Sequence, residues 1–180
     1  YGQALISTGE NSGGIVLRGI DPTTAGEVIN IGREMKSGTL ADLGRAGDLP
    51  GIIIGRELAR QLGVLQHNKV RLISPDGPLS PMGVLPKIRT CEVVGIFETG
   101  MFEYDSTLGF ITLETARSLG GFDEGVHGIE VRVADVEQAD RVAVALQEKL
   151  GRGYSVRDWM QLNQNLFAAL KLEKAGIFIA

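Results

Sequence analysis

Three acidic side chains lie close together in the sequence, and paired carboxylates can carry out general acid–base catalysis. Glu98, Glu103 and Asp105 surround residues 99–102. Acid–base chemistry also requires a partner base, an orienting group or a metal ligand at a suitable spacing. The neighbouring sequence offers none of these. A solvated loop is therefore the favoured interpretation, and a hydrolase that uses this cluster is an alternative.

Other residue types that carry chemistry are few or unsuitably spaced. His67 lies in a polar turn and His127 beside a glycine, and they lack the His-x-x-x-His spacing of a metal site. Residues 51–55 (GIIIG) precede a helix but lack the glycine patterns that cradle phosphate. No Gly-x-Ser-x-Gly elbow is present. We therefore predict no catalytic residue, no metal site and no cofactor, and expect a binding module that is not an enzyme.

The composition is that of a globular domain without a strongly charged partner. The chain has 180 residues, of which 43% are hydrophobic and 22% charged, and its formal net charge is −4. Nucleic acid is therefore not an expected partner. No run of about 18 apolar residues is present. The single cysteine, Cys91, excludes an internal disulfide and is expected to be a small buried hydrophobe in a strand.

The hydrophobic pattern predicts a mixed α/β domain with several hairpins in two lobes. The predicted strands are rich in β-branched residues, and they are residues 14–20, 51–55, 69–74, 88–97, 128–133 and 154–157. The predicted helices carry an apolar stripe of helical period, and they are residues 56–62, 136–150 and 158–174. Residues 128–157 are thereby expected to form a strand–helix–strand unit.

A proline-rich segment joins the predicted strands 69–74 and 88–97 as a long hairpin. It holds four of the six prolines of the chain. Proline fixes φ and lacks an N–H donor, so such a hairpin can be stiff without full pairing. Stiffness lowers the ordering cost of binding a partner. The candidate partner-binding residues of the hairpin are Pro75, Pro78, Leu79, Pro81, Met82, Gly83, Val84, Leu85 and Pro86.

Two conformations of this hairpin remain open. It could fold back so that its apolar residues cover the domain's own core, or it could project as a hook whose tip enters another protein. Met82 is unbranched and suits an irregular apolar pocket. Arg71 precedes the hairpin, and Lys87 and Arg89 follow it. At a period of two residues these three are expected to share one face and to orient an acidic partner.

Six motifs follow one another along the chain. They are residues 19–22 (GIDP), 50–59 (PGIIIGRELA), 81–86 (PMGVLP), 94–100 (VGIFETG), 103–106 (EYDS) and 165–174 (NLFAALKLEK). In this order they resemble the LolC and LolE permease subunits of lipoprotein-releasing ABC transporters. The resemblance covers nearly the whole chain, and the combination is specific although each motif alone is weak.

The resemblance implies an α+β fold. The expected architecture is a mixed α/β periplasmic core with a porter-like lobe, an inserted second lobe and a protruding β-hairpin. The related MacB efflux permeases have such a core. The implied periplasmic domain spans residues 1–172. Its porter-like lobe would comprise residues 1–35 and 126–172, and its inserted lobe residues 36–125 with the hairpin 74–87. Residues 173–180 would begin a transmembrane helix. The domain would lie at the periplasmic face of the bacterial inner membrane.

The implied function is the recruitment of LolA, a periplasmic chaperone that takes lipoproteins from the inner towards the outer membrane. The other implied partners are a second permease subunit (LolE-like or a copy of this chain), a cytoplasmic LolD-like ATPase and the lipoprotein itself. A MacB-like domain of an efflux transporter is the alternative. That role would not need the proline-rich hairpin.

The resemblance also implies roles for individual residues. LolC-type subunits bind LolA through a hairpin hook with a Pro-Met-Gly tip, which residues 81–83 match, and through a pad of basic and polar residues. Arg71 and Arg89 match arginines of the pad. Ile88 stands where the pad has a polar amide, and Lys87 is expected to compensate. LolE-type subunits generally lack the proline-framed hook, so the chain resembles LolC more closely in this feature.

Overall fold

A computed structural model describes residues 1–45, 47–75, 79–80, 83–122 and 124–162. The chain divides into two compact units, Tyr1–Glu130 and Val131–Ala180. The lobe boundaries implied by the resemblance, near residues 35 and 125, stay a prediction. So does the membrane helix expected to begin at residue 173, which lies outside the described residues.

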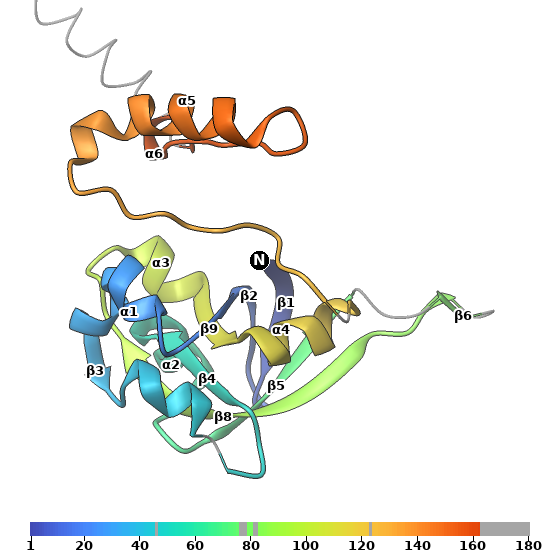
Figure 1. Cartoon of the computed structure of the whole chain (residues 1–180). Coiled ribbons are helices and arrows are strands. Elements are labelled where there is room, and N and C mark those ends of the chain that lie inside the picture. Colours follow the sequence, from blue (N-terminus) through green and yellow to red (C-terminus); the bar gives the residue numbers. More distant parts are fainter. Residues whose placement is uncertain (46, 76–78, 81–82, 123, 163–180) are drawn as a thin grey trace, which may run out of the picture. The chain divides into compact units, whose positions relative to one another are not determined.

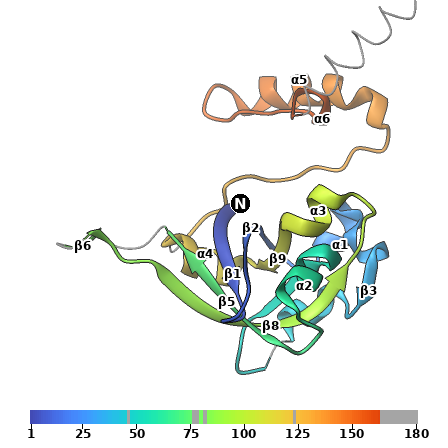
Figure 2. The same ribbon diagram turned by 180° about the vertical axis from the view of Figure 1, so that it is seen from behind.

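The first unit is built on a sheet that closes into a barrel (Figures 1 and 2). Its seven strands are β1 (Gly2–Ser7), β2 (Ser12–Ile20), β3 (Met35–Ser37), β4 (Gly51–Gly55), β5 (Lys69–Ser74), β8 (Lys87–Phe97) and β9 (Leu108–Thr112). They follow the order β3-β8-β4-β9-β2-β1-β5, and β5 also pairs with β8. Six strands therefore close the barrel, and β3 extends it from β8. The pairs β2–β9 and β4–β8 are parallel and the others antiparallel.

Short helices connect these strands. They are α1 (Ala25–Val28), η1 (Asn30–Arg33), η2 (Leu40–Gly44), α2 (Arg56–Leu62), α3 (Phe102–Thr107) and α4 (Leu113–Gly120). Helix α2 ends as the sequence predicts, because Gly63 takes the left-handed conformation that favours glycine, with φ 69°. Helix α4 begins with the Thr112 side chain, which accepts a hydrogen bond from the Thr115 amide.

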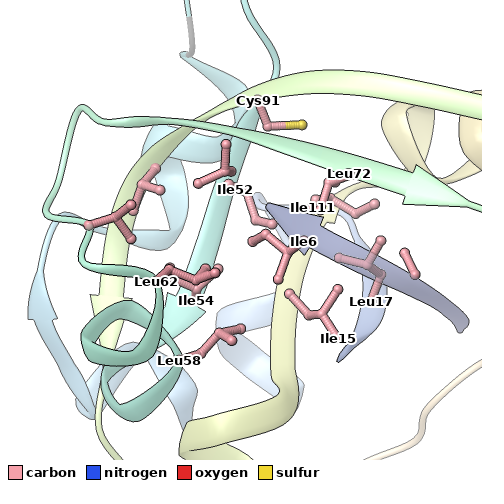
Figure 3. Close-up of a cluster of buried hydrophobic side chains, with 14 of the residues drawn as sticks. Ile6, Ile15, Leu17, Ile52, Ile54, Leu58, Leu62, Leu72, Cys91 and Ile111 are labelled. Carbon is pink, nitrogen blue, oxygen red and sulfur yellow. The ribbon is translucent and has the colours of Figure 1, made fainter. Parts of the chain in front are cut away.

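The barrel interior holds the larger hydrophobic core (Figure 3). On β5, Val70 and Leu72 are buried whereas Lys69 and Arg71 are exposed, which is the period of two expected of a strand with one face in the core. Helix α2 adds the fully buried Leu58 to the same cluster. The α+β class predicted from the sequence is thus confirmed, with a mixed barrel as its centre.

A second hydrophobic cluster lies on the outer face of β4, β9 and the second half of β8. We call this side of the barrel the covered wall, because 3-10 helices η1 and η2 and strand β3 pack over it. Phe97 and Phe110 meet there edge to face, with ring centroids 5.6 Å apart. The buried members of the cluster are Ile31, Leu40, Leu43, Ile53, Val94, Phe97, Leu108 and Phe110.

The second unit contains η3 (Val136–Gln138), α5 (Ala139–Leu150) and α6 (Trp159–Leu162). The Asp135 side chain accepts a hydrogen bond from the Glu137 amide and so caps η3. The helix predicted over residues 136–150 is thus present, with η3 as its first turn and α5 as the remainder. Of the helix predicted over 158–174, α6 is the described part, and the remainder lies outside the described residues.

The structure corrects part of the predicted element list. Residues 128–133 and 154–157, which are all described, form no strands. The strand–helix–strand unit predicted around α5 is therefore wrong, and Ile129, expected to be a strand residue, is 85% exposed. Strands β1, β3 and β9 and helices α3 and α4 were not predicted. β9 pairs with β2 and β4, which are both distant in the sequence. β1 pairs with the adjacent β2 along its whole length and with the distant β5 over its last three residues.

Candidate partner-binding surface

The proline-rich hairpin continues two paired strands of the barrel. β5 and β8 pair without interruption from Lys69 opposite Glu92 to Ser74 opposite Lys87. The exposed Pro75 and Pro86 come next. Neither proline can donate a backbone hydrogen bond, so the ladder stops at this pair. We call Pro75 and Pro86 the hairpin root.

Beyond the root, the backbone forms a small sheet of its own. β6 (Leu79–Ser80) and β7 (Gly83–Val84) pair with each other, with Leu79 opposite Val84. β5 and β8 run out from the barrel side by side, and β6 lies beyond their ends (Figures 1 and 2). Leu85, between β7 and the root, is 54% exposed. Pro78, Pro81 and Met82 lie outside the described residues.

The three basic residues at the hairpin do not share one face, which corrects the sequence-based expectation. Arg71 is opposite Thr90, whereas Arg89 is opposite Leu72 and Lys87 is opposite Ser74. Directly opposed residues of an antiparallel pair project to the same side. Arg71 is thus on the outer side of the barrel, and Lys87 and Arg89 are on the side of the interior. The Lys87 Nζ donates a hydrogen bond of 3.1 Å to the carbonyl of Ser118 in α4.

The outer side of the same strands carries exposed apolar residues, of which the sequence placed only Ile88 near the binding site. The register places Leu5 of β1 opposite Ile73 of β5, and Ile73 opposite Ile88 of β8. Leu5 is 53% and Ile88 60% exposed. We call this side, formed by the outer faces of β1, β5 and the first residues of β8, the open wall. β1 was not predicted, and so nothing in the sequence pattern pointed to Leu5.

The acidic cluster considered for catalysis is divided between two structural roles. The Glu98 carboxylate accepts a hydrogen bond of 2.7 Å from Arg56 and lies 3.5 Å from the Lys36 Nζ. The hydrogen bond from Arg56, with the two positive charges, holds the pKa of Glu98 below its ordinary value. The buried Asp105 accepts three hydrogen bonds, two from Thr99 and one from the Gly100 amide. Glu103 is exposed.

The two histidines and the cysteine are also in contacts or positions that serve the fold. His67 lies 2.8 Å from Glu92, and His127 packs edge to face on Phe122. Within the described part of the chain, no group of three or more histidine, cysteine or acidic residues is placed to hold a metal ion. Cys91 is fully buried, and burial raises the pKa of its thiol to about 12.

The barrel fold is shared with a solved domain of an ABC-type transporter. The structure of this chain is similar to that of the extracellular domain of the noncanonic ABC-type transporter YknZ from Gram-positive bacteria, with a TM-score of 0.55. The similarity covers 87% of this chain and 76% of the YknZ chain at 15% sequence identity, and it shows the fold. No family model matches the sequence. Among the described residues, no helix has both the length and the hydrophobicity needed to cross a bilayer.

The particular family follows from the sequence. The chain is 35% identical to the lipoprotein-releasing system transmembrane protein LolC of Neisseria meningitidis serogroup B, over 98% of this chain and 42% of that protein. It is 32% identical to LolC of Xylella fastidiosa, over 99% of this chain and 43% of that protein. The chain thus spans less than half the length of these relatives. It is homologous to the periplasmic region of LolC-type ABC transporter permeases, a non-catalytic module.

Proposed function

We propose that this domain recruits a LolA-like chaperone through the hairpin and so promotes the transfer of lipoproteins from the inner to the outer membrane. The observation that carries the proposal is the ribbon of β5 and β8, which leaves the barrel and ends at two prolines. The homology to proteins named as LolC of a lipoprotein-releasing system supports the same role.

The tip of the hairpin is the proposed point of insertion. In this proposal residues 81–83 enter the apolar cavity in which the chaperone carries lipid, with Met82 as the deepest side chain. Burying one methionine side chain contributes about 1.5–3 kcal/mol. The ladder break at the root separates the tip from the barrel strands. The four prolines of the segment restrict its backbone before binding, so less entropy is lost on insertion.

The basic residues have separate places in this proposal. Arg71 on the outer side, and Lys87 and Arg89 on the other side, would meet the rim of the chaperone cavity from two directions. Charges at a rim chiefly accelerate association and fix orientation. Arg71 and Arg89 would therefore act mainly on the association rate and its dependence on salt.

The wider assembly is part of the proposal. The whole permease would act with a second permease subunit (LolE-like or a copy of itself), with a cytoplasmic LolD-like ATPase and with the lipoprotein. The domain would lie on the periplasmic face of the inner membrane, joined to it by segments outside the 180 residues. In this arrangement the domain performs no catalysis, and ATP hydrolysis belongs to the separate ATPase subunit.

Calorimetric titration of the chain with a purified LolA-like chaperone tests the insertion. Met82→Glu is expected to abolish measurable binding, because a carboxylate would have to enter an apolar cavity. Leu65→Glu is the matched control, because Leu65 is 73% exposed and lies before β5, at the end of that strand away from the hairpin. Equal affinity of Met82→Glu and the unaltered chain would contradict the insertion.

The fold similarity to the YknZ domain favours a second candidate, a MacB-like domain of an efflux transporter. Such a domain would act with an outer-membrane channel and would not need the hairpin. Capture experiments with the chaperone and with such a channel distinguish the two. Deletion of residues 75–86 should abolish capture in the first role and leave it unchanged in the second.

A further inference from the structure

A groove without charged residues follows the open wall from the hairpin root to helix α3. Its volume is about 830 Å³. The polar members of its lining are two glutamines, a serine and a threonine. Its main apolar members are Leu5, Val16, Ile73, Pro75, Pro86 and Phe102. We call this feature the wall groove. Exposed apolar surface of this kind marks contacts with other molecules.

The α3 end of the wall groove is held in a fixed conformation. The three hydrogen bonds accepted by the buried Asp105 tie the turn before α3 to the helix itself. This turn presents Met101 and Phe102, which are 55% and 70% exposed. Aromatic and methionine side chains are enriched in protein interfaces, and a backbone that is already fixed loses less entropy on binding.

The other end of the wall groove lies at the hairpin root. Pro75 and Pro86 line the groove and also mark the point where the β5–β8 ladder stops. A cavity that receives the hairpin must place its rim near this root. The wall groove therefore begins at the base of the proposed hairpin contact, where the body of the partner would lie.

The openness of the groove indicates the kind of occupant. Leu5 and Phe102 remain more than half exposed in it, whereas small-molecule sites bury most of the ligand surface. A broad protein surface can cover both side chains at once. The lack of charge in the lining favours an apolar partner surface over an acidic one.

We propose that the wall groove is a second contact for the protein that receives the hairpin, a carrier with an apolar rim beside its lipid cavity. This inference rests on the proposed function. It adds a contact through β1 and α3, separate from the hairpin tip and from the basic residues. β5 and β8 belong to the open wall and also lead to the hairpin root, so one pair of strands connects the wall groove with the base of the hairpin.

The first test compares affinities for the purified LolA-like chaperone. Leu5→Gln and Phe102→Gln are expected to weaken binding about ten-fold each, since each loses the burial of a large apolar side chain. Leu65→Gln, with the same change at an exposed leucine outside the groove, should leave the affinity unchanged. If Leu5→Gln and Phe102→Gln bind like the unaltered chain while Met82→Glu does not bind, the inference is wrong and the proposed function stands. If the unaltered chain does not bind the chaperone, the proposed function itself fails.

Thiol labelling gives a second readout that does not depend on affinity. Cys91 is buried, and burial keeps its thiol protonated, so maleimide should react with an introduced cysteine alone. The chaperone is expected to slow labelling of Leu5→Cys at least ten-fold and to leave Leu65→Cys unchanged. Equal labelling of Leu5→Cys with and without chaperone would overturn the inference. So would protection by palmitate alone, which would indicate an acyl-chain site, or protection that rises with the concentration of the chain alone, which would indicate a second copy.

Discussion

The covered wall and the open wall of the barrel share one interior but have different outer faces. On the covered wall, Ile53 and Phe110 are 0% and 1% exposed. On the open wall, Leu5 and Ile88 are 53% and 60% exposed. Residues 30–44 supply the cover on one side. Among the described residues of the first unit, no corresponding segment packs over Leu5 and Ile88.

This difference separates the side chains that stabilise the domain from those that remain available to a partner. An apolar side chain stabilises the fold when the fold itself removes it from water, and it stabilises a complex when the partner does so. Substitutions on the covered wall should therefore change the free energy of unfolding. Substitutions on the open wall should change binding and leave unfolding nearly unaffected.

The largest expected effect is on the covered wall. Phe110→Ala should lower the free energy of unfolding by about 3–5 kcal/mol, because it leaves a cavity beside Phe97 and η2. Leu5→Ala should lower it by about 1 kcal/mol or less, since the leucine is already half exposed. Urea unfolding followed by circular dichroism measures both values. Similar losses in the two variants would show that the open wall also depends on its side chains for stability.

Two glycines sharpen the comparison with a smaller effect. A Cβ at Gly55 would collide with the backbone of Asp105, whereas a Cβ at Gly14 would meet no atom within 4 Å. Gly14 is opposite Leu5 on the open wall. Gly55→Ala should destabilise by about 1–3 kcal/mol, because α3 must move away from β4. Gly14→Ala should be neutral or stabilise by about 0.4–1 kcal/mol, since its φ is not in the left-handed region. Thermal unfolding of both variants measures the two effects, and a loss of stability in Gly14→Ala as large as that in Gly55→Ala would show that the packing argument is wrong.

The sequence predicted elements whose signal is local. The all-apolar run of β4, the alternation along β5 and the glycine that ends α2 each depend on a few neighbouring residues. The prolines likewise marked the hairpin before its strands were known. The LolC-like class followed from motifs spread over the chain, and the homology to LolC confirms it.

The faces of the hairpin strands could not be read from the sequence, because they depend on register. A period of two correctly places Lys87 and Arg89 on the same face of β8. Whether Arg71 joins them depends on which residue of β8 it faces, and that residue is Thr90. A shift of one residue in the pairing would have moved Arg71 to the other side. The exposure of Leu5 was equally out of reach, since it reflects a cover that is present on one wall and absent from the other.

The smallest expected effect concerns the polar edge of the covered wall. Glu98 is the residue after β8, and its carboxylate forms ion pairs with Arg56 of α2 and Lys36 of β3. Its pKa is lowered in the folded chain, first by the hydrogen bond from Arg56. Its contribution to stability is therefore present above the ordinary pKa of about 4.5 and is lost as the pH falls through the lower folded value.

Glu98→Gln should accordingly reduce the loss of stability between pH 6 and pH 3. The change will be small, because the pair is partly exposed to solvent and screened by salt. Urea midpoints measured across this pH range in low salt test it, with Glu103→Gln as the control. Glu103 is exposed and takes part in none of the ion pairs found between described residues. An unchanged acid dependence in Glu98→Gln would mean that β3 stays on the covered wall through its backbone pairing with β8 and its apolar contacts, without help from the charges.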